Sequence, residues 1–166
     1  MIIVITDACF LIDMIDINLF EEFLGLGYQV HIASSVFAEL EDDEYVKPVS
    51  KCIEQKKMFL YNLTAADQTA LEKLMKKHSS RLSEPDCSCL YLAKEINATI
   101  LTCEKLLTKV AKNLDLDVHG SLWILDRLLD ASMITKRIAY RKLKDLMSIN
   151  PRLPVVECQK RLKGWG

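Results

Sequence analysis

Short runs of β-branched and other apolar residues alternate with helix-forming segments along this chain. That alternation limits the fold more than any other feature of the sequence. The runs occupy residues 2–6, 28–33, 58–63, 98–102 and 116–120. Strands that alternate with helices in this way are typical of an α/β domain with a mostly parallel sheet. The sequence therefore predicts a parallel sheet flanked by helices.

The segments between the runs carry helical patterns. Residues 18–27 have apolar positions at helical spacing and end in glycines, which suit the end of a helix. A shorter helix is predicted over residues 34–40, with Ser34 or Ser35 as its N-cap. Further helices are predicted over residues 103–116, 121–134 and 136–150, and in a short piece at the end of the chain.

Two of the predicted helices begin with recognisable capping residues. Residues 64–80 open with Thr64, and Asp67 stands where a weak variant of the capping box has its acidic residue. Residues 83–96 open with Ser83, and a proline follows in the first turn. Both starts favour well-defined helices that connect the third run to the fourth.

Length and composition are those of one globular domain. The chain has 166 residues, half of them hydrophobic, without an internal repeat or a flexible linker, so a single domain over residues 1–166 is expected. Its 22 basic and 23 acidic residues nearly cancel, so a nucleic acid would have to be held by a local patch. No apolar stretch reaches the roughly 20 residues that span a bilayer, and a cytoplasmic location without membrane contact is expected.

The six cysteines do not follow the spacing of a zinc site or form a CxxC pair. We therefore expect reduced thiols that serve mostly as small core residues. Of the histidines, His31 and His119 fall in predicted strands and are expected to be structural. The acidic stretch over residues 40–45 is predicted to be a solvated surface turn.

Four acidic residues follow the predicted strands and helix starts in a way that directs them to one edge of the sheet. Asp7 comes directly after the first run, and Glu39 lies in the helix after the second. Asp86 lies in the first turn of the helix over residues 83–96, and Glu104 follows the fourth run closely. Ligands of parallel α/β sheets bind outside the carboxyl ends of the strands. The four side chains are therefore expected to converge there.

Each acid taken alone has an ordinary structural explanation. Acidic residues are favoured in the first turn of a helix, which would account for Asp86 and Glu104. Asp7 fits this explanation worst, because a carboxylate beside an apolar strand is costly to bury without a partner or a metal.

Convergence of the four acids would raise their pKa values unless a cation were present. Hard divalent cations such as Mg²⁺ or Mn²⁺ prefer oxygen ligands and would relieve that repulsion. A site of this kind activates water and stabilises the charge that develops on a phosphodiester during hydrolysis.

Three segments together resemble the PIN-domain family, which includes many metal-dependent ribonucleases and the VapC-type toxins of toxin-antitoxin pairs. They are "VITDACFLIDM" at residues 4–14, "IASSVFAELED" at residues 32–42, and the stretch over residues 82–125. The resemblance covers residues 1 to about 130, leaving a C-terminal helical extension over residues 131–166. It implies a three-layer α/β/α fold whose strands are ordered 3-2-1-4-5.

The resemblance also implies roles for individual residues. The expected metal-binding and catalytic residues are Asp7, Glu39, Asp86 and Glu104. Glu84 is an alternative to Asp86, and Thr102 and Ser121 are the expected supporting polar residues. The family usually has an aspartate at the position of Glu104. The longer side chain leaves open whether Glu104 binds metal directly, through a water molecule, or not at all.

The implied activity is Mg²⁺- or Mn²⁺-dependent hydrolysis of RNA, with an antitoxin and a second copy of the chain as expected partners. Lys105, Lys109 and Lys112 share one predicted helix face that would meet an RNA backbone or simply face solvent. Arg141, in the basic helix over residues 136–150, would hold RNA or belong to a helix that covers the sheet. The alternative function is a PIN-like module that binds nucleic acid or protein without cutting.

Overall fold

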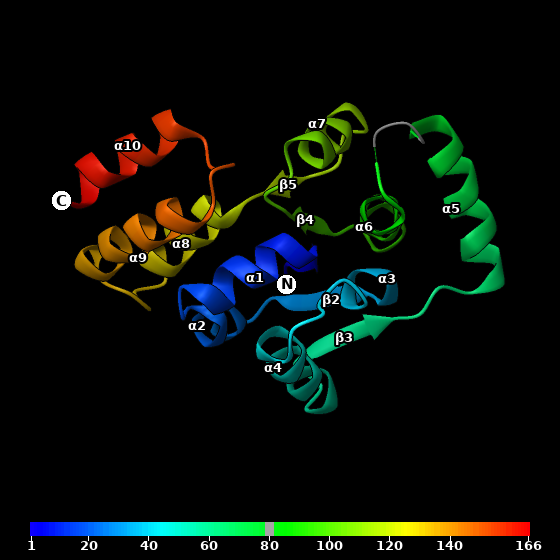
Figure 1. Ribbon diagram of the computed structural model, residues 1–166, viewed down its shortest axis with the longest axis horizontal. Coiled ribbons are helices and arrows are strands. Elements are labelled where there is room, and N and C mark those ends of the chain that lie inside the picture. The colour runs from blue at the N-terminus through cyan, green and yellow to red at the C-terminus, as the bar shows by residue number, and fades with distance from the viewer. Residues whose placement is uncertain (79–81) are drawn as a thin grey trace.

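The computed structural model describes residues 1–78 and 82–166, and within them five parallel strands form one sheet (Figure 1). The strands are β1 (Ile3–Thr6), β2 (Gln29–Ala33), β3 (Met58–Tyr61), β4 (Thr99–Leu101) and β5 (Val118–His119). Their order is β3-β2-β1-β4-β5, and every neighbouring pair is parallel. The predicted fold class and strand order are therefore confirmed, with each strand shorter than its predicted run.

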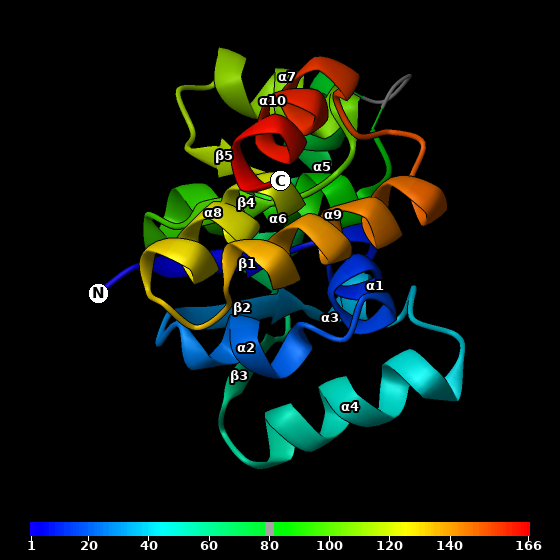
Figure 2. The same cartoon turned by 90° about the vertical axis from the view of Figure 1, so that its left-hand side faces the viewer.

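Helices cover both faces of the sheet. The helices are α1 (Ala8–Asp16), α2 (Phe20–Gly25), α3 (Ser34–Phe37), α4 (Asp43–Glu54), α5 (Ala65–His78), α6 (Glu84–Ile96), α7 (Lys105–Asn113), α8 (Ser121–Asp130), α9 (Lys136–Ile149) and α10 (Val155–Trp165). Helix α6 lies against β1, β2 and β4, with α3 and α5 packed on it. Helices α8 and α9 lie in front of the strands in Figure 2, and α5 and α6 lie behind them.

The central strands are buried on both faces, which is why their sequences read as continuous apolar runs. Val4 and Ile5 of β1 and Ile100 of β4 have no exposed surface. Leu92 of α6 and Leu125 of α8 belong to the same core and are also fully buried. The sheet is thus held rigidly between its helical layers. In the described residues, no helix is both long and apolar enough to cross a membrane.

The two predicted capping residues both act as caps. The Oγ atom of Ser83 accepts a hydrogen bond from the Asp86 amide, and the Asp86 carboxylate accepts one from the Ser83 amide, both at 3.3 Å. Thr64 and Asp67 form the same reciprocal pair, at 3.1 and 2.8 Å. The predicted range 64–80 extends past the end of α5 at His78, and residues 79 and 80 lie outside the described part.

The segment after β2 differs from its prediction. Helix α3 ends at Phe37, and its N-cap is Ala33 without a side-chain hydrogen bond, so the proposed Ser34 or Ser35 cap is wrong. Glu39 consequently lies just beyond the helix instead of inside it. The acidic stretch over residues 40–45 was predicted to be a surface turn, but residues 43–45 form the start of α4, a helix that the sequence patterns did not reveal.

The C-terminal helices are tied to α1 by a buried polar contact. Asn150, which ends α9, donates from Nδ2 to Oδ2 of Asp13 at 2.7 Å, and Ser121 donates to the same oxygen at 3.3 Å. Both Asp13 and Asn150 are buried. Burial raises the pKa of Asp13, and the hydrogen bonds from Asn150 and Ser121 oppose that increase. The contact connects residues 137 positions apart and fixes α9 against the rest of the fold.

Replacing Asn150 by alanine is expected to lower the free energy of unfolding by about 2 kcal/mol, because the buried Asp13 carboxylate loses a donor. Urea denaturation followed by circular dichroism measures the change. Asn113→Ala is the matched control, since Asn113 is exposed at the end of α7 and its loss should change stability by less than about 0.5 kcal/mol. Equal losses in both variants would contradict a specific role for the Asp13–Asn150 contact.

Candidate metal centre

Asp7 stands at the carboxyl end of β1, where the chain turns into α1. It is the N-cap of that helix, and its Oδ1 accepts a hydrogen bond from the Phe10 amide at 2.9 Å. Its Oδ2 accepts a hydrogen bond from the Thr102 hydroxyl, at the end of β4. Its own amide donates to the Leu101 carbonyl at 3.1 Å. The residue as a whole is 5% exposed, and two strands and a helix start hold its carboxylate in one orientation.

The electrostatic environment of Asp7 is unfavourable for a free carboxylate. Burial raises the pKa of Asp7 to about 7, and the charges of Asp86 and Glu104 add to that increase. The hydrogen bonds from Thr102 and Phe10 oppose it. In the described part of the chain, Asp7 forms no ion pair with a basic side chain. A cation at this edge of the sheet would therefore stabilise the ionised form.

The other predicted acids lie close enough to influence one another. Burial raises the pKa of Glu39, and the charges of Asp86 and Glu104 raise it further. Asp86 thus acts on both Asp7 and Glu39, whereas Glu84 is exposed in the same turn of α6. All four predicted carboxylates share one electrostatic neighbourhood at the carboxyl edge of the sheet.

Two of these carboxylates are engaged with other groups. Asp86 completes the capping box of α6, and Glu104 forms an ion pair with Arg152, which follows α9. Within residues 1–78 and 82–166, no three acidic, histidine or cysteine side chains are arranged so that they could hold a metal ion. The oxygen-only donor set suits Mg²⁺ or Mn²⁺, but metal binding would require these side chains to move closer together.

The two supporting residues have different partners. Thr102 contacts Asp7 directly, and its Oγ1 also accepts a hydrogen bond from the Glu104 amide at 3.0 Å. Ser121 instead contacts Asp13, a buried acid that was not among the predicted site residues. The sequence did contain a signal for Asp13, because an acidic residue inside an apolar helix requires buried polar partners.

A disulfide between Cys9 and Cys103 corrects the expectation that all thiols are reduced. The two residues are 94 positions apart, with their Cα atoms 6.2 Å from each other. They follow β1 and β4, so the bond joins the two turns that present Asp7 and Glu104. The remaining cysteines, Cys52, Cys87, Cys89 and Cys158, are free and buried, in agreement with their predicted core role.

The four residues that were predicted to contact nucleic acid divide into two that line a cavity and two that lie outside it. Lys105 and Lys112 of α7 line a cavity of about 410 Å³ beside Thr102. Lys109, on the same helix, is exposed outside that cavity. Arg141 is exposed on α9, which packs against α8 and α10. Helix α9, which carries Arg141, therefore packs against other helices.

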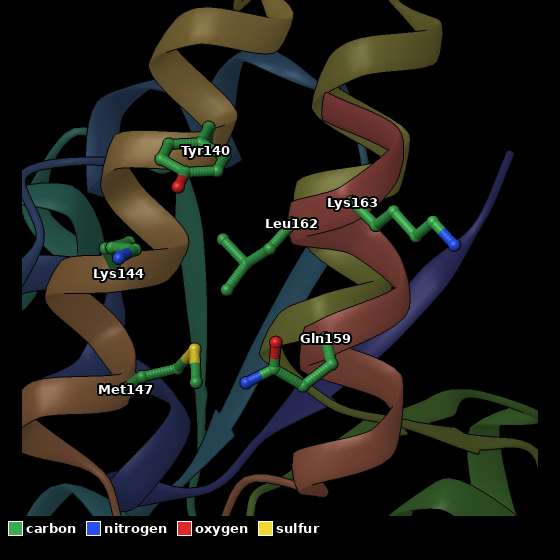
Figure 3. Close-up of a pocket in the computed structure, with 6 residues that line it drawn as sticks. All are labelled: Tyr140, Lys144, Met147, Gln159, Leu162 and Lys163. Atoms are coloured by element: carbon green, nitrogen blue, oxygen red, sulfur yellow. The ribbon is translucent and has the colours of Figure 1, made fainter. Parts of the chain in front are cut away.

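A second groove, of about 430 Å³, lies between α9 and α10 (Figure 3). Tyr140 and Met147 of α9 face Leu162 of α10 across it. The Lys144 ammonium lies 5.7 Å from the centre of the Tyr140 ring. This cation occupies one approach to the ring, as Arg127 does at the Trp123 ring, also at 5.7 Å.

Comparisons with known proteins agree with the fold. The family model described as "DUF3368: PIN domain" matches residues 3–166. A similar solved structure is VapBC2 from Rickettsia felis, crystallised with a DNA fragment from its promoter. That chain is 15% identical, with a TM-score of 0.51, over 72% of this chain and 98% of its own. The search of curated proteins gave no match. The match to nearly the whole chain shows that this protein belongs to the PIN-domain family.

Proposed function

We propose that this protein is a Mg²⁺- or Mn²⁺-dependent ribonuclease whose centre is built around Asp7. The supporting observation is the buried Asp7 carboxylate, whose pKa is raised to about 7 and which, within the described residues, forms no ion pair although Asp86 and Glu104 act on it. Burying a carboxylate in this way is costly, and binding a divalent cation is a function that would explain it. Membership in the PIN-domain family supports a nuclease in particular.

In this proposal Asp7, Glu39 and Asp86 would hold the ion once their side chains move together, and Glu104 would join them on leaving Arg152. A bound ion would supply an activated water molecule and would stabilise the charge that develops on the phosphodiester. Thr102 and the Phe10 amide keep the Asp7 carboxylate oriented, so that this one ligand would need little reorganisation. The disulfide between Cys9 and Cys103 holds the turns that carry Asp7 and Glu104 at a fixed separation.

Replacing Arg152 by alanine is expected to tighten Mn²⁺ binding by up to about fivefold, because a half-exposed ion pair of this kind contributes roughly 0–1 kcal/mol. The loss of Arg152 frees Glu104 and removes a positive charge near the proposed ion. Isothermal titration with Mn²⁺ measures the change. Arg137→Ala is the control, since Arg137 is exposed near the start of α9. Weaker binding in the Arg152 variant would show that the ion pair does not compete with the metal.

The VapBC2 structure also bears on partners, since it contains a protein complex bound to promoter DNA. We propose that this chain likewise binds an antitoxin, and that it forms a homodimer. Inspection of the adjacent reading frame, followed by co-expression and size-exclusion chromatography with light scattering, tests both. A monomer that acquires no partner on co-expression would contradict these two proposals without affecting the nuclease.

The nuclease is tested by incubating the protein with a panel of single-stranded and structured RNAs. We expect cleavage with Mg²⁺ or Mn²⁺, none in EDTA, and recovery when excess Mn²⁺ is restored. The competing function is a PIN-like module that binds without cutting, which the engagement of Glu104 by Arg152 favours. RNA binding without cleavage under any metal condition would support that module and contradict the nuclease.

A further inference from the structure

A cavity of about 410 Å³ opens directly beside the proposed metal centre. Thr102 and Cys103 form part of its wall, and Thr102 also donates a hydrogen bond to Asp7. The cavity therefore begins one side chain away from the carboxylate that anchors the centre. Its volume lies within the range of sites that hold small organic ligands, roughly 300–1,000 Å³. A group bound there would be a near neighbour of a reacting phosphodiester.

Flat aromatic surfaces line one part of the cavity. The rings of His119 and Trp123 are stacked, with centroids 4.3 Å apart and an angle of 7° between their planes. Tyr28 also stacks on Trp123, at 6.0 Å, and the Arg127 guanidinium lies 5.7 Å from the centre of the Trp123 ring. The His119 ring is also held by Asp117, whose carboxylate lies 3.2 Å from Nε2. An ordered stack of this kind is a platform on which a nucleobase can stack without sequence preference.

Lysine side chains of α7 line another part of the cavity. Lys105 and Lys112 are exposed on α7, and within the described residues neither forms an ion pair. Arg152 and Arg161 also line the cavity, but they are paired with Glu104 and with Asp126. The two lysines are therefore the cations that remain to contact a phosphate.

Among the residues that the structure describes, those that line the cavity include no aspartate or glutamate. Leu122, Leu153 and Pro154 supply apolar surface beside the aromatic stack. The combination suits a ligand with a flat ring and an attached anion. An acidic peptide would satisfy the lysines but would leave the aromatic stack without a matching ring.

We infer that this cavity binds one nucleotide of single-stranded RNA beside the cleavage site, with its base on the His119–Trp123 stack and its phosphate near Lys105 and Lys112. The inference rests on the proposed nuclease function and assigns it a substrate subsite. It requires unpaired RNA, because a base within a duplex has no free face or edge to offer.

The cationic part is tested in EDTA with a fluorescein-labelled RNA octamer of mixed sequence, using anisotropy over a range of salt concentrations. The variant Lys105→Ala/Lys112→Ala is expected to bind at least about tenfold more weakly and to lower the log–log salt slope by about 1.4, the value for two lost single-strand phosphate contacts. Lys109→Ala removes one positive charge from the same helix outside the cavity, and its affinity should stay within about twofold of wild type.

The aromatic part is tested by fluorescence. The chain has two tryptophans, so Trp165→Phe leaves Trp123 as the single reporter. The RNA octamer should quench Trp123 emission, and an octa-glutamate peptide should not. Adding His119→Ala should weaken RNA binding about tenfold, within the range for one lost base stack. Circular dichroism melting of each variant separates a loss of binding from a loss of folding.

The outcomes separate this inference from the nuclease itself. Equal weakening by Lys109→Ala and by the double variant would overturn it, since the binding would then be diffuse. Quenching by the glutamate peptide would also overturn it and would assign the cavity to an acidic protein partner. Unchanged binding by the double variant, in a protein that cleaves RNA, would refute the subsite alone. Octamer binding that depends on Lys105 and Lys112 in a protein that never cleaves would refute the nuclease alone.

Discussion

Replacing Asp7 by asparagine is expected to reduce metal-dependent RNA cleavage by at least about a hundredfold, the scale of losing one preorganised charge-stabilising group. Asparagine keeps the shape of the side chain, and its amide oxygen still accepts the bond from Phe10. It removes the negative charge that the proposed ion requires. Initial rates on the best substrate of the RNA panel, measured over a range of Mn²⁺ concentrations, give the loss.

The control for that experiment is the same chemical change at the opposite edge of the sheet. Asp115 is exposed before β5 and has a φ of 57°, a left-handed conformation that asparagine tolerates well. Asp115→Asn is therefore expected to leave cleavage within about twofold of wild type, as surface changes away from special features usually do. If Asp7→Asn cleaves as fast as Asp115→Asn, the activity arises elsewhere on the chain or from a contaminant.

The sheet was predictable because local patterns determine it. Each strand is an apolar run buried on both faces, and the intervening helices require parallel connections. Asp7 was predictable for the same reason. An acidic residue that directly follows a buried strand has one location in such a fold, at the carboxyl edge where ligands bind.

Long-range polar contacts were not predictable from local patterns. Arg152 pairs with Glu104 across 48 positions, and Asn150 contacts Asp13 across 137. Neither contact produces a periodic pattern in the sequence, because each depends on how the C-terminal helices pack against the rest of the fold. The same packing brings Arg152 and Pro154 to the cavity beside Thr102. Helix α4 was missed for a different reason, since Pro48 in its interior disguises the pattern.

The raised pKa of Asp7 predicts an unusual dependence of stability on pH in the metal-free protein. Asp7 titrates near pH 3.8 when unfolded and near 7 when folded, so folding favours its protonated form. Below about pH 4 the Asp7 side chain therefore leaves the free energy of unfolding unchanged. As the pH rises to 7 it increasingly destabilises the fold, and above that its destabilisation amounts to about 4 kcal/mol. Asp7→Asn removes this penalty. In EDTA the variant should be more stable than wild type at pH 8, and the two should converge near pH 4.

Urea denaturation of both proteins between pH 4 and pH 8 measures that difference, and carboxylates that do not act on Asp7 cancel because both proteins contain them. The coupling of Asp7 to Asp86 and Glu104 is part of the measured difference. Adding Mn²⁺ at pH 8 should stabilise the wild type by about 2.7 kcal/mol at a hundred times its dissociation constant, and should leave the variant unchanged. Parallel pH curves would show that Asp7 is already compensated without metal. The same substitution would then abolish cleavage without stabilising the fold. The pH dependence in EDTA measures how much the buried Asp7 carboxylate destabilises the fold, and the Mn²⁺ titration measures whether a bound ion reverses it. Together they decide whether the fold tolerates this destabilisation in order to keep a metal ligand in place.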